Sequence, residues 1–486
     1  MNNKGFAISG IVYSVLILFF LLVFAILGIL GSRKIVLDKL KNEVMNELNE
    51  EVANNIYKDD SGANYPRLLD NMIPVLYDNE KSSWVYADIY EKWYDYDEKM
   101  WANAIVLKQG ITKVVGQTIS EDDIALMYVW IPRYKYVIFN AHNESIEEQQ
   151  IDIVFEKGTN KTGTVKCVDA INQTDAEGNK ISEICIDTVN NDIVNNASTY
   201  THPAFTFGED EIEGFWVGKF ENSTTDEVCL NEANETNCNK DSHIIEIKAN
   251  SDSLRYINIS NMFNSVLSIT NNYGINNADS HMIKNMEWGA IAYLTQSKYG
   301  RCTNGVCEEI TINNVLKNEE TYTTQTGCAA NEISGEVSSV CQNEYDTPGG
   351  FKASTTGNIY GVYDMSGGAN EYVMANMVDL NGYFFSGVTG LINIDERYYD
   401  KYTHDSSYST FLRGKLGDAT KENIKEFDVL LGAWFEDFTT FPAGDYHWLA
   451  RGIYHKINAE VGIFSFQRTK GSSDETRGSR SILIKK

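Results

Sequence analysis

Eight cysteines constrain this chain of 486 residues more than any other feature, because they fall in close sequential pairs. Eight cysteines allow many connectivities, so the sequence does not fix which sulfurs are joined. An even number confined to stretches rich in Asn, Thr and Gly nevertheless predicts disulfides that close local loops in an oxidising compartment. The expected pairs are Cys167 with Cys185, Cys229 with Cys238, Cys302 with Cys307, and Cys328 with Cys341.

Zinc binding is the alternative use of paired cysteines. Structural zinc sites need CxxC knuckles or histidines close to the cysteines. Cys302 and Cys307 are too far apart in sequence for such a knuckle, and the seven histidines are scattered along the chain. The sequence therefore favours disulfides over zinc.

Residues 6–31 contain no charged side chain and are almost entirely apolar. A bilayer core is spanned by a helix of about 20 apolar residues. A cleaved signal peptide has a shorter apolar run followed by a small-residue cleavage site, and neither feature is present here. We therefore expect residues 1–31 to form a transmembrane anchor that holds the chain in a bacterial cell membrane through residues 6–31.

The tripeptide Lys4-Gly5-Phe6 ahead of this stretch resembles the leader of type IV prepilin-like proteins. Those leaders are cut after a Gly that precedes a long apolar helix. Prepilins usually carry Glu five residues into the mature chain, where this sequence has Gly10. The resemblance implies an alternative function as a minor pilin-like structural protein.

The orientation of the expected anchor is contested by two signals. Basic residues follow the span, and the positive-inside rule then places the C-terminal side in the cytoplasm. The paired cysteines indicate the opposite, because disulfides do not persist in a reducing cytosol. We expect a single-pass protein whose C-terminal part is extracellular.

Three further regions come after the anchor. Apolar residues at spacings of three and four predict an amphipathic stalk helix, followed by a polar linker, over residues 32–66. Residues 67–127 are expected to form a small β-containing region, and residues 128–486 a large domain. Aromatic and β-branched runs predict strands, whereas residues 282–300 carry a helical pattern. The expected strands lie at 84–90, 101–108, 127–139 and 214–221.

Net charge excludes one class of partner. The chain has 68 acidic and 41 basic residues, which gives a formal net charge of −27. Such a balance repels phosphate backbones, so we expect no nucleic-acid binding.

One segment carries a family resemblance. The stretch from Thr355 to Val373 reads TTGNIYGVYDMSGGANEYV, and Arg451-Gly452 and Gly478-Ser479-Arg480 occur later in the chain. Together they resemble the formylglycine-generating-enzyme-like, or sulfatase-modifying-factor, domain over residues 128–486. The resemblance implies an α+β fold of the C-type lectin type behind the transmembrane helix. The matching residues of the central motif are Asn358, Gly361, Tyr363, Asp364, Met365, Ser366, Gly367 and Glu371.

The resemblance also raises a metal site. Family members often hold calcium near this turn through Asn and Glu side chains, but here Gly368 stands where the Asn is expected. Calcium would then be bound by the Gly368 carbonyl and the Glu371 carboxylate. The alternative is that Asp364 and Glu371 accept hydrogen bonds from turn amides.

Catalytic signatures of the family are missing. Formylglycine-generating oxidases hold copper with a cysteine pair in their C-terminal segment, whereas the last cysteine here is Cys341. Soft thiolate ligands select copper(I), so the C-terminal segment of this chain lacks the ligands that the oxidase reaction needs. The sequence also has no GxSxG, GxxxxGK[ST] or HExxH motif. We therefore expect no enzymatic activity, and a formylglycine-generating oxidase is the disfavoured alternative.

A binding protein is the function that the resemblance favours. The same fold serves as a display scaffold, for example in the variable proteins of diversity-generating retroelements, and their ligand face comes from the C-terminal segment. We expect an adhesin-like, cell-surface protein with an unknown extracellular protein or glycan ligand. Trp448, Phe464 and Phe466 are expected in the core. The expected ligand-binding residues are Tyr446, His447, Tyr454, His455, Lys456, Gln467 and Lys470.

Overall fold

The computed structural model divides the chain into two units, Met1–Tyr57 and Lys58–Lys486, and the strands of the described residues belong to the second unit. The predicted anchor over residues 1–31, and the predicted stalk as far as residue 54, lie outside the described residues. The described residues are 55–140, 146–318, 320, 322–333, 335–387, 389–392, 394–406, 411–426, 430–453 and 461–486.

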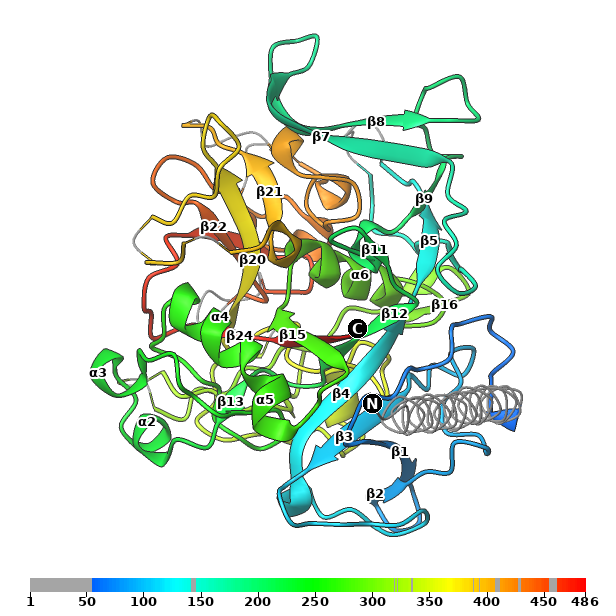
Figure 1. The fold of residues 1–486 in the computed structure, drawn as a ribbon, viewed down its shortest axis with the longest axis vertical. Coiled ribbons are helices and arrows are strands. Elements are labelled where there is room, and N and C mark those ends of the chain that lie inside the picture. Colours follow the sequence, from blue (N-terminus) through cyan, green and yellow to red (C-terminus); the bar gives the residue numbers. More distant parts are fainter. Residues whose placement is uncertain are drawn as a thin grey trace, which may run out of the picture. The chain divides into compact units, whose positions relative to one another are not determined.

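The predicted fold class, α+β behind a transmembrane helix, was wrong. The second unit is built from mixed, mostly small sheets with few helices (Figure 1). The α+β expectation rested on the family resemblance and one helical pattern, whereas the aromatic and β-branched runs that fill the chain form strands.

The predicted location, a single-pass protein of the cell membrane, also has to be corrected. Within the described part of the chain, no helix is long and apolar enough to cross a membrane. Four disulfides are present, and they suggest an extracellular or secreted protein.

The largest sheet has seven strands, and every neighbouring pair is antiparallel. All nine residues of its strand β4 are buried, and β4 pairs with β3 on one side and β12 on the other. The strand nearest the C-terminus, β25, lies between β12 and β15. In spatial order the strands are β15 (Ala278–Met282), β25 (Ser481–Lys485), β12 (Gly214–Gly218), β4 (Ile124–Pro132), β3 (Asn103–Leu107), β1 (Met72–Asp78) and β2 (Ser83–Tyr86).

A second sheet positions the candidate ligand-binding residues. Its central strand β20 (Asn370–Val378) is buried along its whole length. It pairs in parallel with β21 (Asp400–Thr403) and β24 (Arg477–Ser479), and antiparallel with β22 (Trp448–Arg451). Strand β23 (Phe466–Thr469) pairs with the far side of β22.

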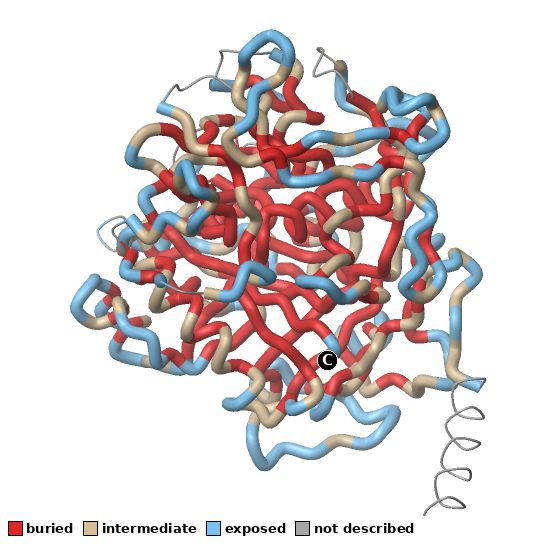
Figure 2. Tube along the Cα trace, turned by 45° about the horizontal axis from the view of Figure 1, so that its top comes forward, coloured by how far each residue is buried: buried red, intermediate tan, exposed pale blue. Residues whose placement is uncertain are grey.

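Helix α6 (Asn285–Thr295) confirms the predicted helix, but it differs from an amphipathic surface helix. All 11 of its residues are buried, so no face is left for solvent. Buried segments fill the interior of the second unit, and exposed segments lie around its outside (Figure 2). A Cβ added at Gly289 would collide with the carbonyl oxygen of Gly417, so glycine is required for this close packing. The other α-helices of the described residues are short: α2 (Glu227–Asn231), α3 (Glu235–Cys238), α4 (Ile259–Leu267) and α5 (Ile269–Tyr273).

Short strands and turns of 3-10 helix complete the unit. The minor strands are β5 (Tyr134–Val137), β6 (Ile153–Phe155), β7 (Val165–Thr174), β8 (Lys180–Asp187), β9 (Thr199–Thr201), β10 (Thr206–Phe207), β11 (Asp210–Glu211), β13 (Ser223–Thr224), β14 (Ile245–Glu246), β16 (Cys302–Thr303), β17 (Val306–Cys307), β18 (Cys328–Ala329) and β19 (Asn343–Glu344). The 3-10 helices are Glu121–Asp123, Pro203–Phe205, Gly350–Ala353, Glu396–Tyr398, Phe411–Arg413, Lys421–Asn423 and Trp434–Glu436.

The disulfides confirm the sequential pairing of the cysteines. Two of them cross a two-stranded hairpin at directly paired positions, on β7–β8 and on β16–β17. Each therefore ties together two strands that have no large sheet to support them. The four bridges are Cys167–Cys185, Cys229–Cys238, Cys302–Cys307 and Cys328–Cys341.

The apolar run at residues 127–139 forms two strands instead of one. The break falls at Arg133, which is fully buried between β4 and β5. Its Nε donates to Glu156 Oε2 at 3.0 Å, and its Nη1 donates to the carbonyl of Phe205 at 3.1 Å. A buried guanidinium needs such partners, so the chain turns here to supply them.

Candidate ligand-binding face

The predicted ligand face is built on the antiparallel pair β22–β23. Leu449 lies opposite Arg468, and Ala450 lies opposite Gln467. Neighbouring side chains on a strand point to opposite faces, so Gln467 and Arg468 are directed apart. The three aromatic residues expected in the core, Trp448, Phe464 and Phe466, are fully buried there.

Tyr446 and Lys470, two of the predicted ligand-binding residues, lie close together, and Arg468 joins them. The Lys470 Nζ lies 5.3 Å from the centre of the Tyr446 ring, and the Arg468 guanidinium carbon lies 4.8 Å from it. Tyr446 is half-buried and Lys470 is exposed. Cation–π contacts at exposed sites contribute about 0.5–1 kcal/mol each. We call Tyr446, Arg468 and Lys470 the Tyr446 patch.

Sequence reasoning missed Arg468, although a signal for it was present. Arg468 and Lys470 are two residues apart at the end of β23, and side chains at that spacing lie on the same side of a strand. A pair of basic residues at strand spacing, with an aromatic residue just ahead of the partner strand β22, therefore indicated a cationic cluster.

His447 lies under the surface, apart from the patch. Its ring stacks on Phe385 with centroids 3.6 Å apart and on His404 at 5.2 Å. Burial, with a smaller contribution from His404, lowers the pKa of His447 to about 4. The ring is therefore neutral at physiological pH and packs as an aromatic side chain.

Gln467 belongs to a different neighbourhood. Its Oε1 accepts hydrogen bonds from Asn370 Nδ2 at 3.3 Å and from Arg477 Nη2 at 3.5 Å. The remaining predicted ligand-binding residues, Tyr454, His455 and Lys456, lie outside the described residues.

The turn predicted to bind calcium is occupied by a buried ion pair. Arg480 donates from Nε to Glu371 Oε2 at 3.0 Å and from Nη2 to Glu371 Oε1, and both side chains are fully buried. Burial raises the pKa of Glu371 to about 7, although Arg480 opposes that rise. Both carboxylate oxygens are thus engaged by a cation of the chain, and this donor set fits an ion pair better than a calcium ligand.

Gly368 and Asp364 have structural partners in the same turn. Gly368 has a φ of +70°, and a Cβ there would collide with the Glu221 carboxylate. Asp364 Oδ1 accepts from the Gly327 backbone N at 2.9 Å and from Asn313 Nδ2 at 2.8 Å. Asp364 thus binds a turn amide, as in the alternative to calcium. Calcium at Gly368 and Glu371 stays a prediction.

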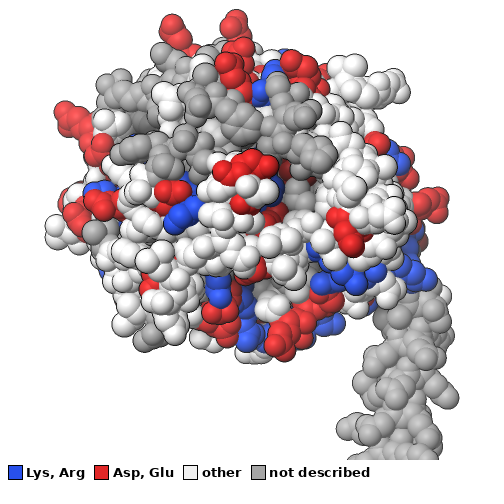
Figure 3. Space-filling model, turned by 90° about the horizontal axis from the view of Figure 1, so that it is seen from above, with Lys and Arg blue, Asp and Glu red and all other residues white. Residues whose placement is uncertain are grey.

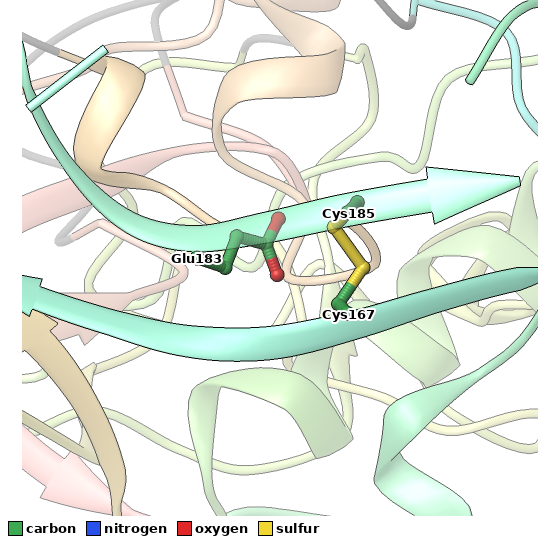
Figure 4. Close-up of side chains that lie close together, drawn as sticks. All are labelled: Cys167, Glu183 and Cys185. Atoms are coloured by element: carbon green, nitrogen blue, oxygen red, sulfur yellow. A yellow bond between two sulfur atoms is a disulfide. The ribbon is translucent and has the colours of Figure 1, made fainter. Parts of the chain in front are cut away.

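A different trio has the composition of a metal site. Potential ligand atoms of Cys167, Glu183 and Cys185 lie within 4.8 Å of one another. The two sulfurs form a disulfide between β7 and β8, with Glu183 beside it (Figure 4). Metal ions bind thiolates, and the disulfide leaves none. Glu183 Oε1 instead accepts from the Leu416 backbone N at 2.6 Å and lies 3.0 Å from Lys421 Nζ.

No protein-family model matches the chain, and no curated protein matches it. The described fold is mostly sheet and is not specific to the formylglycine-generating-enzyme-like family. The resemblance of residues 128–486 to that family therefore stays a prediction.

Proposed function

We propose that this protein is an extracellular binding protein that recognises an acidic glycan through the Tyr446 patch. One observation carries the proposal: two cationic side chains meet on one half-exposed tyrosine ring in a chain whose net charge is −27. The four disulfides support an extracellular setting.

The chemistry of the patch suits carboxylate or sulfate groups on a sugar. A guanidinium such as that of Arg468 binds such groups through two parallel hydrogen bonds, and Lys470 adds a point charge. Lys470 has no ion-pair partner among the described residues, so its charge is available to a ligand. Tyrosine supplies rigid contact area at little entropic cost, and for this reason it is common in recognition surfaces.

A glycan array tests this function. The full-length protein is applied to sialylated, sulfated and uronic-acid glycans and to neutral glycans of matched size. We expect binding to the acidic glycans only, and weaker binding as NaCl is raised, because salt screens exposed charges. Equal binding to the neutral glycans, or binding that salt does not change, contradicts the proposal. Binding to acidic proteins but to no glycan also contradicts it.

A further inference from the structure

A cavity of about 690 Å³ opens in a part of the unit that contains none of the Tyr446 patch residues. Its size falls in the range of small-molecule sites. The walls come from the β7–β8 hairpin, the turn between β10 and β11, the start of α6 and the segment that leads into β21. Acidic and basic side chains are interspersed on the face seen from above, the side on which the hairpin lies (Figure 3).

Two opposite charges in the cavity lining retain unused hydrogen-bonding capacity. Lys284 is only 6% exposed, and its Nζ has no hydrogen-bond partner among the described residues; the nearest carboxylate oxygen, on Glu287, is 3.9 Å away. Asp400 uses Oδ2 to accept from the backbone N of Met286 at 2.8 Å. Its Oδ1 accepts no hydrogen bond from any described residue.

The other cations of the lining are already neutralised. Each of their charged groups lies within 3.1 Å of a carboxylate of the lining, whereas the carboxylate nearest to Lys284 Nζ is 3.9 Å away. Lys415 Nζ lies 2.5 Å from Asp169, Lys401 Nζ lies 2.6 Å from Glu396, and Arg397 Nη2 lies 3.1 Å from Asp395. Lys284 and Asp400 thus differ from the other charges around the cavity.

The hairpin wall is fixed in place. The Cys167–Cys185 bridge crosses it, and the Asn172 backbone N donates to Thr403 Oγ1 at 3.0 Å. The Thr403 backbone N in turn donates to Ser182 Oγ at 2.9 Å. These links join both strands of the hairpin to β21, whose first residue is Asp400. The cavity is therefore formed before any ligand arrives, which lowers the cost of binding.

We propose that this cavity is a binding site for a free α-amino acid, whose ammonium group donates to Asp400 Oδ1 and whose carboxylate accepts from Lys284 Nζ. A buried charge is costly unless it is paired and hydrogen-bonded. Asp400 is half-buried, and the nearby charge of Lys284 opposes the rise in its pKa that burial causes, but the two side chains share no hydrogen bond. A zwitterion supplies the missing hydrogen bond to each of them, whereas a ligand with a single charge supplies only one. The side chain of the amino acid lies against the apolar part of the lining, which includes Phe207, Met286 and Tyr399.

Calorimetric titration of the full-length protein with each of the common L-α-amino acids tests the site. We expect at least one to bind. Its N-acetyl derivative, which lacks the ammonium group, and its amide, which lacks the carboxylate, should each bind at least about ten-fold more weakly. A dipeptide that binds as well as the free amino acid contradicts the free amino acid as ligand.

Three variants locate the binding. Asp400→Asn and Lys284→Met keep the size of each side chain and remove one charge, and each should weaken binding at least about ten-fold. Glu209→Gln, on the exposed rim of the same cavity, is the matched control and should bind as the wild type does. Circular dichroism and thermal melting establish that each variant is folded.

The proposal is also overturned if no amino acid binds at millimolar concentration, or if binding is unchanged in both Asp400→Asn and Lys284→Met. If a variant does not fold, the comparison of blocked and free amino acids on the wild-type protein still tests whether the site recognises both charged groups of the ligand. Blocked derivatives that bind as tightly as the parent amino acid contradict the paired-charge site.

Discussion

Two charged side chains that are buried away from the cavity, Lys219 and Glu422, are held by specific partners. Lys219 is fully buried, and its Nζ donates to Asn103 Oδ1 at 2.9 Å and to the carbonyls of Ile359 and Gly361. Glu422 is also buried, and its Oε2 accepts from Tyr136 at 3.0 Å and from Tyr293 at 2.8 Å. Sequence showed the charges of these residues, but the partners come from distant segments and only the fold brings them together.

Glu422 gives a prediction about pH. Burial raises its pKa from the ordinary glutamate value of 4.5 to about 7. Between these values the folded chain keeps a proton that the unfolded chain releases, so this group makes the protein less stable as pH rises from 4.5 to 7. The free energy of unfolding then falls with pH by about 1.4 kcal/mol per pH unit on account of this group. Glu422→Gln should remove this contribution to the slope.

Urea unfolding across this pH range measures the effect of Glu422→Gln. The exposed Glu177→Gln is the control and should leave the slope as in the wild type. Identical slopes for the wild type and Glu422→Gln would show that Glu422 does not hold a proton in the fold.

At the scale of elements, the sequence predicted the strands and hairpins whose formation depends on residues close together in the chain. Aromatic and β-branched runs located β2, β3, β4 and β12, and cysteine spacing located the disulfide hairpins. The helical pattern found α6 but missed that the helix is buried on all sides. Burial of a helix depends on the sheets and loops around it, which periodicity does not reveal.

Gly289→Ala tests the close packing of α6. Alanine favours an exposed helix over glycine by about 1 kcal/mol, so propensity alone predicts stabilisation. Here the added methyl group collides with the Gly417 backbone, and we expect destabilisation of about 2 kcal/mol or more. Chemical denaturation measures the change in the free energy of unfolding.

Gly110→Ala is the control. Nothing lies within 4 Å of the Cβ added there, so the variant should lose only about 1 kcal/mol of stability, because of the positive φ at this position. A more stable Gly289→Ala variant would contradict the packing.

The β7–β8 hairpin provides a second test of an element. Replacing Cys167 and Cys185 together by Ser opens a loop of 18 residues, a change that typically costs about 3 kcal/mol. Hydrogen exchange should speed up over residues 165–187 and stay unchanged in the buried strand β4. If the hairpin and β4 lost protection equally, the bridge would stabilise the whole unit and not the hairpin alone.

For the whole molecule, the sequence predicted the oxidising setting but not the arrangement that makes a site. The Tyr446 patch joins residues from two neighbouring segments of the chain, and two of them, Tyr446 and Lys470, are among the residues that the sequence suggested for ligand binding. The cavity unites Lys284 and Asp400, which lie more than 100 residues apart and share no motif. The predicted α+β fold was wrong because a family motif and one helical pattern were extended to a unit made mostly of small sheets. The predicted membrane location found no support, since no helix of the described residues is long and apolar enough to cross a membrane.

Charge reversal on the Tyr446 patch tests the central claim most directly. Arg468→Glu with Lys470→Glu replaces two cations by two anions, and its control, Lys166→Glu with Lys352→Glu, makes the same change at two exposed lysines elsewhere. The measurement is the affinity of each full-length variant for the acidic glycan that the wild type binds best, together with its melting temperature. We predict at least about ten-fold weaker binding for the patch variant, unchanged melting for both, and wild-type binding for the control. Unchanged binding by a folded patch variant would contradict recognition through Tyr446, Arg468 and Lys470.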